Sequence, residues 1–269
     1  MVAKALSSIK EALPAGVELV AVSKFHPVDR LMEAYNAGQR VFAESRPQEL
    51  AAKVPQMPSD VKWHFIGHLQ TNKLKLVLPY VDLVQSVDSL HLLEAINAWG
   101  MANNKVTDIL LELHLGAEET KQGFTEEEIL ALLGAKGAVS PTVAGPGPKC
   151  RGSRPQVSQV CVFRPTCDAN QEHEKKSVAD QAFFADLRHM FGIRLRGLMG
   201  MATNTDDMTV VEKDFQRIEE LFLRILSEHP ELEAFNQLSI GMSADWPVAV
   251  RHHATMVRIG TDIFGPREY

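Results

Sequence analysis

The chain has 269 residues, of which 45% are hydrophobic, and it carries a formal net charge of −6 at pH 7. This composition supplies one sizeable core, and the acidic balance argues against a nucleic-acid or anionic-membrane surface. No apolar stretch approaches the roughly 20 residues that a membrane-spanning helix needs. The N-terminal residues follow an amphipathic helix pattern without the apolar core of a signal peptide. We therefore expect a soluble cytoplasmic protein.

Strand-like apolar runs alternate with amphipathic helix patterns along the chain. The expected strands span residues 17–23, 40–44, 61–67, 83–87, 108–115, 194–201, 238–242 and 256–264. The expected helices span residues 28–37, 47–54, 71–77, 90–99, 129–133, 207–227 and 247–250. About eight such repeats are typical of a single TIM-type (β/α)8 barrel, here over residues 1–269. An open doubly wound sheet is the alternative, but no glycine-rich dinucleotide fingerprint follows the first strand.

One segment, residues 137–177, departs from this alternation. It is rich in proline and glycine and holds all three cysteines, so no disulfide framework supports the fold. A metal site from Cys150, Cys161, Cys167 and His173 is one interpretation, but the paired C-x-x-C spacing of zinc modules is missing. A disordered insertion, or a stretch foreign to the ancestral gene product, is the favoured interpretation. Its place before the sixth strand predicts that it spares a site at the carboxyl ends of the strands.

Lys24 ends the first expected strand, and its amine would therefore lie at the mouth of a barrel. A partly desolvated amine loses some preference for its protonated form and can condense with an aldehyde. Pyridoxal 5′-phosphate is the aldehyde that proteins most often hold in this way. Taken alone, a lysine at a strand end is more often only solvated, so the other strand ends carry the argument.

Small and hydroxyl residues follow the last two strands, where barrels often bind phosphate. Ser243 follows the seventh strand, and Gly260 and Thr261 lie at the end of the eighth. Arg258 precedes them, and an arginine directed at a pyridine nitrogen would disfavour protonation of that nitrogen. Each of these segments is also compatible with an ordinary tight turn.

Two histidines accompany the third strand, His64 within it and His68 just after it. A hydrogen-bonded core residue is a better interpretation of each than a catalyst.

Five segments in this order resemble the pyridoxal phosphate homeostasis protein family. They are VAVSK (20–24), WHFIGHLQTNK (63–73), GLMGM (197–201), LSIGMS (238–243) and VRIGTDIFGPR (257–267). The resemblance covers about residues 15–135 and 180–269. It implies the isolated barrel of a fold-type III alanine racemase, which binds and delivers or buffers pyridoxal phosphate without a settled catalytic activity.

The resemblance also implies a set of cofactor-binding residues. Lys24 matches the lysine that holds the cofactor as a Schiff base, and Arg258 matches the arginine facing the pyridine nitrogen. Ser45 takes the place of a common asparagine near the ring. The phosphate-binding residues of the family are matched by Ser243, Gly260 and Thr261, with the backbone of Met242 close by.

The resemblance implies a carrier rather than an enzyme, with pyridoxal phosphate-dependent apoenzymes as recipients. An uncapped barrel mouth is compatible with a monomer, which is the expected state. No sequence after Phe264 would form the β domain that supplies the opposing tyrosine of racemases. Two alternatives stay open: a racemase that borrows a second acid or base, and a barrel that binds phosphometabolites without covalent chemistry.

Three departures from the family pattern bear on the site. Ala43 replaces a usual glycine, and Pro47 takes a fair first-turn helix position. Residues 251–254 replace a stretch that normally contains a glutamate and a glycine just before the eighth strand. We expect Lys24 to keep its chemistry despite these changes. The packing beneath the phosphate site is the feature that they are expected to disturb.

Overall fold

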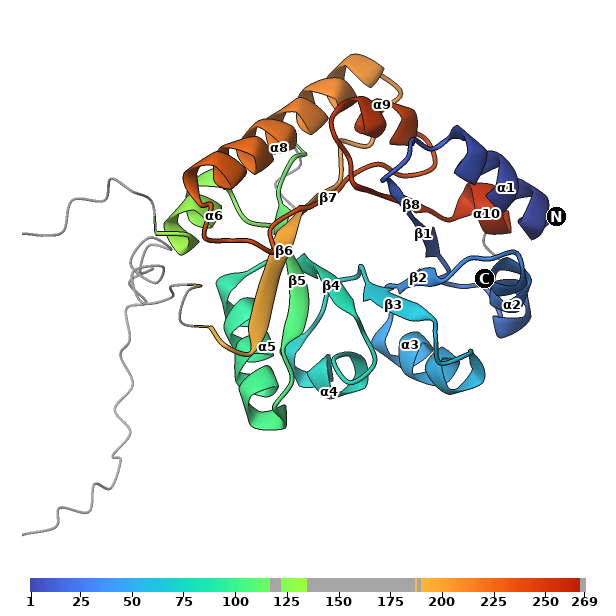
Figure 1. The fold of residues 1–269 in the computed structure, drawn as a ribbon, viewed down its shortest axis with the longest axis horizontal. Coiled ribbons are helices and arrows are strands. Elements are labelled where there is room, and N and C mark those ends of the chain that lie inside the picture. Colours follow the sequence, from blue (N-terminus) through green and yellow to red (C-terminus); the bar gives the residue numbers. More distant parts are fainter. Residues whose placement is uncertain (117–121, 135–186, 188–189, 267–269) are drawn as a thin grey trace, which may run out of the picture.

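The computed structural model is a closed barrel of eight parallel strands surrounded by helices (Figure 1). It describes residues 1–116, 122–134, 187 and 190–266. Each strand pairs with the next along the chain, and β8 pairs with β1 to close the barrel. The strands are β1 (Glu18–Val22), β2 (Val41–Glu44), β3 (Lys62–Phe65), β4 (Leu83–Val87), β5 (Thr107–Leu113), β6 (Ile193–Gly200), β7 (Gln237–Ser239) and β8 (Met256–Ile259). The predicted TIM-type barrel is confirmed.

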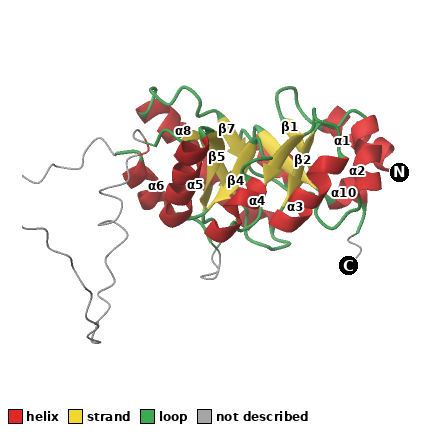
Figure 2. Ribbon diagram, turned by 90° about the horizontal axis from the view of Figure 1, so that it is seen from below, coloured by secondary structure: helices red, strands yellow, loops and turns green. Residues whose placement is uncertain are grey.

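The helices lie outside the strands, as the view from a perpendicular direction also shows (Figure 2). They are α1 (Val2–Ala12), α2 (Val28–Asn36), α3 (Pro47–Lys53), α4 (Leu74–Val77), α5 (Leu90–Asn103), α6 (Glu126–Leu132), α8 (Met208–Glu228), α9 (Trp246–Arg251) and α10 (Thr261–Phe264). Short 3₁₀ turns at Val54–Gln56 and Thr71–Lys73 extend α3 and precede α4. In the described ranges, no helix is both long enough and apolar enough to cross a membrane.

Local sequence signals set the beginnings of several helices. The hydroxyl of Ser89 accepts a hydrogen bond from the Leu92 amide at the start of α5. Thr125 and Glu128 form a reciprocal capping box at the start of α6, as their spacing predicts. These side chains satisfy amide groups that have no partner within the helix, and they define where each helix begins.

The core has two parts, one on each face of the barrel wall. The larger part lies between the strands and the helices, and it includes the inward face of α8. The smaller part fills the barrel with strand residues: Val20, Val41, Ala43, Leu83, Leu110, Met199 and Met256. In the described part of the chain, these side chains pack the interior of the barrel.

The last two strands end earlier than the sequence pattern predicts, and the predicted limits were wrong there. β8 ends at Ile259, because the amides of Ile263 and Phe264 donate to the carbonyl of Gly260 and begin α10. β7 ends at Ser239, and Gly241 then turns the chain with a φ of +91°. The segment 137–177 lies outside the described residues.

The pairing of β6 with β7 needs glycine at position 197. A Cβ atom there would lie 1.7 Å from the carbonyl oxygen of Gln237, and the φ of Gly197 is +156°. We expect Gly197→Ala to lower the free energy of unfolding by about 3 kcal/mol or more, measured by urea denaturation. The matched control is Gly38→Ala, where φ is +88° but no atom lies within 4 Å of the new Cβ; it should cost about 1 kcal/mol. Equal losses for the two variants would contradict the steric explanation.

Candidate functional site

A cavity of about 460 Å³ lies at the carboxyl ends of the strands. Residues from four parts of the chain line it: the β1–α2 loop, the end of β3, the segment at and after β6, and the segment from β7 to α10. These parts meet because all eight strands are parallel and their carboxyl ends face the same side. The lining contains both apolar and polar groups, as is usual for a site that binds a small molecule.

Six of the seven residues predicted for the cofactor site line this one cavity. They are Lys24, Met242, Ser243, Arg258, Gly260 and Thr261. The seventh, Ser45, follows β2 and is not among the residues that line the cavity. Its backbone packs instead against Gly67, where a Cβ would lie 2.2 Å from the Ser45 carbonyl oxygen.

Lys24 lies in the loop between β1 and α2, and its side chain is partly buried. The next residue, Phe25, has a φ of +69°, a left-handed conformation that costs a residue with a side chain about 1 kcal/mol. Its ring lies under the guanidinium of Arg46, whose central carbon is 4.1 Å from the ring centre. The surroundings therefore hold the chain beside Lys24 in a conformation that it would not adopt alone.

Arg258 reaches the cavity from β8 with a guanidinium that is almost completely buried. Nη1 donates to the carbonyl oxygen and the hydroxyl of Ser239, at 2.7 and 2.6 Å, and Nη2 donates to the carbonyl of Gly200 at 2.8 Å. Burial lowers the pKa of Arg258 to about 10, and the negative charges of Glu112 and Asp245 partly oppose this shift. The group therefore stays cationic at neutral pH, in a fixed orientation.

Small groups and hydroxyls also line the cavity. Gly260 lies close to β1, since a Cβ there would be 3.1 Å from the Val22 carbonyl oxygen. Two residues with hydroxyl groups, Ser243 and Thr261, line the cavity as well. The Met242 amide already donates to the Asp245 carboxylate at 2.5 Å. Met242 therefore contributes to the wall, but its N–H is engaged within the protein.

Known proteins resemble this chain over nearly its whole length. Residues 2–141 match the model of the alanine racemase N-terminal domain family. The pyridoxal phosphate homeostasis protein of Haemophilus influenzae is 30% identical over 94% of this chain and 86% of its own length. The protein of the same name from Schizosaccharomyces pombe is 32% identical, over 93% of this chain and 84% of its own length. The chain belongs to the pyridoxal phosphate homeostasis protein family.

Solved structures agree with this membership. PipY of Synechococcus elongatus without PLP is 28% identical and has a TM-score of 0.75, covering 98% of this chain and 100% of PipY. The PLP-bound structure of PipY has a TM-score of 0.72 over the same share of each chain. The alanine racemase of Clostridium difficile is 13% identical with a TM-score of 0.64, and 57% of that chain is covered, which shows a shared fold. The resemblance indicated by the sequence motifs is thus confirmed.

The stretch that departs from the family pattern is tied into the packing. In residues 251–254, His252 Nδ1 lies 2.6 Å from a carboxylate oxygen of Glu219 on α8, and His253 contacts the other oxygen. Ala254 is buried. These contacts link α8 to the segment that leads into β8.

Seven residues that line the cavity were not predicted as site residues. They are Val22, His26, Ile66, Met199, Met201, Asn204 and Ala244. His26 follows Lys24 by two residues, and its ring stacks on Phe264 with centroids 5.0 Å apart. Ile66 extends β3, and Asn204 lies in the loop after β6. His26 could have been found from its position two residues after Lys24, and Val22, Ile66, Met199 and Met201 from the family motifs that contain them, whereas Asn204 and Ala244 lie outside those motifs.

The two histidines of the third-strand motif have different environments. His64 is buried, and Gln85 Nε2 donates to its Nδ1 at 2.9 Å, which confirms the prediction of a hydrogen-bonded core residue. The side chain of His68 is half exposed and lies 2.8 Å from Asp88, so it is not a core residue. In the described part of the chain no cluster of three or more histidines, cysteines and acids could hold a metal ion. The predicted set of Cys150, Cys161, Cys167 and His173 lies outside the described residues.

Glu112 on β5 gives the barrel a distinctive pH dependence. Burial, together with the negative charge of Asp88, raises the pKa of Glu112 to about 7. The folded protein therefore binds a proton more tightly than the unfolded chain, and this stabilising contribution is complete below about pH 4.5 and is lost as the pH rises through 7. We expect the free energy of unfolding of Glu112→Gln, relative to the unmodified protein, to increase by up to about 3 kcal/mol between pH 4.5 and 8. Urea denaturation at several pH values measures this, and parallel curves for the two proteins would contradict it.

Proposed function

We propose that this chain binds pyridoxal 5′-phosphate in the 460 Å³ cavity and holds it as a Schiff base on Lys24, acting as a carrier in cofactor homeostasis. The observation that supports this most is the convergence of an amine, a fixed cation and a hydroxyl-bearing wall on one cavity. When bound, pyridoxal phosphate supplies an aldehyde carbon that condenses with an amine, and the aldehyde oxygen leaves as water. The names of the family relatives and the PLP-bound structure of PipY support the same proposal.

The cavity residues divide the work of binding. Lys24 provides the amine, partly buried at the mouth of the barrel. Ser243, Gly260 and Thr261 would hold the phosphate through hydroxyls and exposed backbone, with Met242 packing beside them. Arg258 would face the pyridine nitrogen. Because Arg258 is held by three acceptors and stays cationic, it would keep that nitrogen unprotonated.

Ser45 has a weaker place in the proposal. It is partly buried after β2 and lies outside the cavity lining. We propose that Ser45 lies near the cofactor ring and that its short hydroxyl contacts the cofactor less directly than the other six residues do.

The proposed carrier has no efficient catalytic turnover, and the composition of the cavity supports this. Exchange of a proton on both faces of a substrate needs an acid or base on each side. Lys24 and His26 both come from the loop after β1. Among the described residues of β6, β7 and the segments after them, those lining the cavity are Met199, Met201, Asn204, Met242, Ser243 and Ala244, none of which titrates near neutral pH.

The proposal extends to the setting in which the carrier acts. We propose a cytoplasmic monomer that exchanges the cofactor with pyridoxal phosphate-dependent apoenzymes. The cavity mouth supports direct exchange, since the side chains of Met201 and Met242 beside it are each 38% exposed.

The first prediction of this proposal concerns Lys24. The purified protein should gain a visible absorption band with pyridoxal phosphate, and borohydride should convert it to a stable adduct on Lys24. Lys24→Ala should lose the band and bind the cofactor about tenfold or more weakly. Lys4→Ala, a change of an exposed lysine on α1, is the control and should behave as the unmodified protein. A Lys24→Ala variant with undiminished affinity would instead support the non-covalent binding of phosphometabolites.

The second prediction concerns turnover. The loaded protein, incubated with alanine or serine in deuterated water, should not incorporate deuterium at the α-carbon, because a second acid or base is lacking. Mass spectrometry of the recovered amino acid measures the exchange. Steady wash-in with inversion of configuration, abolished in Lys24→Ala, would show a racemase.

A further inference from the structure

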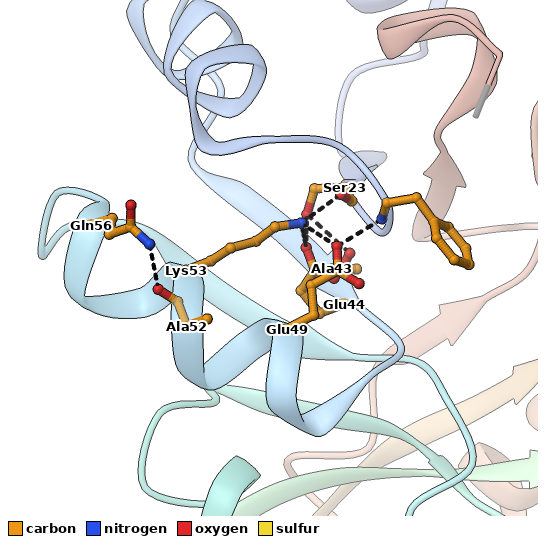
Figure 3. A network of polar contacts seen from close by, with 8 residues as sticks. Ser23, Ala43, Glu44, Glu49, Ala52, Lys53 and Gln56 are labelled. Atoms are coloured by element: carbon orange, nitrogen blue, oxygen red, sulfur yellow. Dashed lines mark hydrogen bonds and ion pairs between the residues drawn. The ribbon is translucent and has the colours of Figure 1, made fainter. Parts of the chain in front are cut away.

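A cluster of three charged side chains contacts Ser23, the residue before Lys24 (Figure 3). We call Lys53, Glu44 and Glu49 the Lys53 cluster. The amine of Lys53, at the end of α3, lies 2.7 Å from Glu44 Oε1 and 2.6 Å from Glu49 Oε1. The same amine donates to the backbone carbonyl of Ser23 at 2.9 Å. Lys53 therefore joins the ends of β1 and β2 to α3.

The cluster also holds the two residues on either side of Lys24. The hydroxyl of Ser23 donates to Glu44 Oε1 at 2.7 Å. The backbone amide of Phe25 donates to Glu49 Oε1 at 2.7 Å. Together with the bond from Lys53 to the Ser23 carbonyl, these contacts fix the backbone immediately before and after Lys24. The left-handed φ of Phe25 is therefore held by a carboxylate that Lys53 itself anchors.

The burial of the cluster suggests a role beyond stability. The side chains of Lys53 and Glu44 are 7% and 0% exposed, and that of Glu49 is 19% exposed. Removing charges from water costs free energy that a buried ion pair often fails to recover, so an apolar replacement would serve stability equally well. Glu44 Oε2 is buried with no hydrogen-bond partner among the described residues, which adds to this cost. The contacts of the cluster are instead concentrated on the backbone around Lys24.

We propose that Lys53 is a positioning residue for Lys24: through Glu44 and Glu49 it holds the Ser23–Phe25 backbone so that the Lys24 amine faces the cavity. The inference rests on the proposed function, in which Lys24 attaches the cofactor. Without the Lys53 cation, two carboxylates that now share one amine would repel each other in a buried site. The loop would then leave its strained conformation, and the Lys24 amine would lose its fixed approach.

The test compares Lys53→Met with a matched lysine at the other end of the barrel. Lys105 precedes β5, and its amine is also held by backbone carbonyls, those of Leu78 and Val81. We expect Lys53→Met to attach pyridoxal phosphate about tenfold to a hundredfold more slowly, followed by the growth of the visible band. Lys105→Met should attach it at the unmodified rate, at a temperature where thermal unfolding shows both variants folded.

A second pair of variants separates positioning from folding. Glu49→Gln keeps an oxygen that accepts from the Phe25 amide and from Lys53, whereas Glu49→Ala removes it. We expect the glutamine variant to restore most of the attachment rate and the alanine variant to resemble Lys53→Met. Pyridoxine 5′-phosphate carries the phosphate and ring without an aldehyde, and its dissociation constant should be unchanged in all four variants.

Each outcome bears on the inference. Slow attachment in Lys53→Met and Glu49→Ala with unchanged pyridoxine 5′-phosphate binding supports it. Attachment at the unmodified rate in folded Lys53→Met and Glu49→Ala overturns it and leaves the proposed function intact. Equal loss of pyridoxine 5′-phosphate binding and attachment shows general damage and also overturns it. Failure of the unmodified protein to attach pyridoxal phosphate overturns the proposed function and this inference with it.

Discussion

The pairing of β8 with β1 is the interaction on which the cavity depends. It aligns Val20 with Arg258 and Ala21 with Ile259, residues more than two hundred positions apart in the sequence. This alignment sets the loop after β1 beside the loop after β8, so Lys24 and Gly260 border the same space. The two loops approach closely, since a Cβ atom at Gly260 would lie only 3.1 Å from the Val22 carbonyl oxygen. A barrel that failed to close here would keep most of its strand pairs and lose its site.

A chain of hydrogen bonds inside the barrel holds the cationic side of that site. Arg258 donates to Ser239, Ser239 donates to Gln85, and Gln85 donates to Nδ1 of His64. The direction is consistent only if His64 is neutral, and burial lowers its pKa to about 3. Since Nη2 also donates to the Gly200 carbonyl, the orientation of Arg258 is set by groups on β3, β4, β6 and β7 together. The polar groups in the barrel therefore serve orientation, while the apolar cluster around Val20 and Met256 fills the volume.

The sequence allowed the barrel and six residues of the cavity wall to be predicted, because both depend on local patterns. Strand ends such as Lys24 and Ser243 are readable from apolar runs followed by turn residues. The Lys53 cluster was not readable in this way. Glu49 and Lys53 are four residues apart on a helix, the spacing of an ordinary surface ion pair, and only the packing of α3 against the ends of β1 and β2 buries them. The shortened β8 has a similar cause, since the bonds to the Gly260 carbonyl depend on how α10 docks.

The arrangement that favours binding also works against catalysis. A fixed cation at the pyridine nitrogen would weaken the ring as an electron sink, so a carbanion beside it would gain little stabilisation. The same cation would not hinder attachment through Lys24, because attachment needs only an accessible amine and a defined approach of that amine to the aldehyde. Rigid backbone around Lys24 supplies the approach, and the partly exposed methionines at the mouth leave a path for release. Under the proposed function, a site with one reactive amine, one fixed cation and a partly exposed mouth would hold the cofactor and pass it on, whereas two-sided proton exchange would need an acid or base on each face of a substrate.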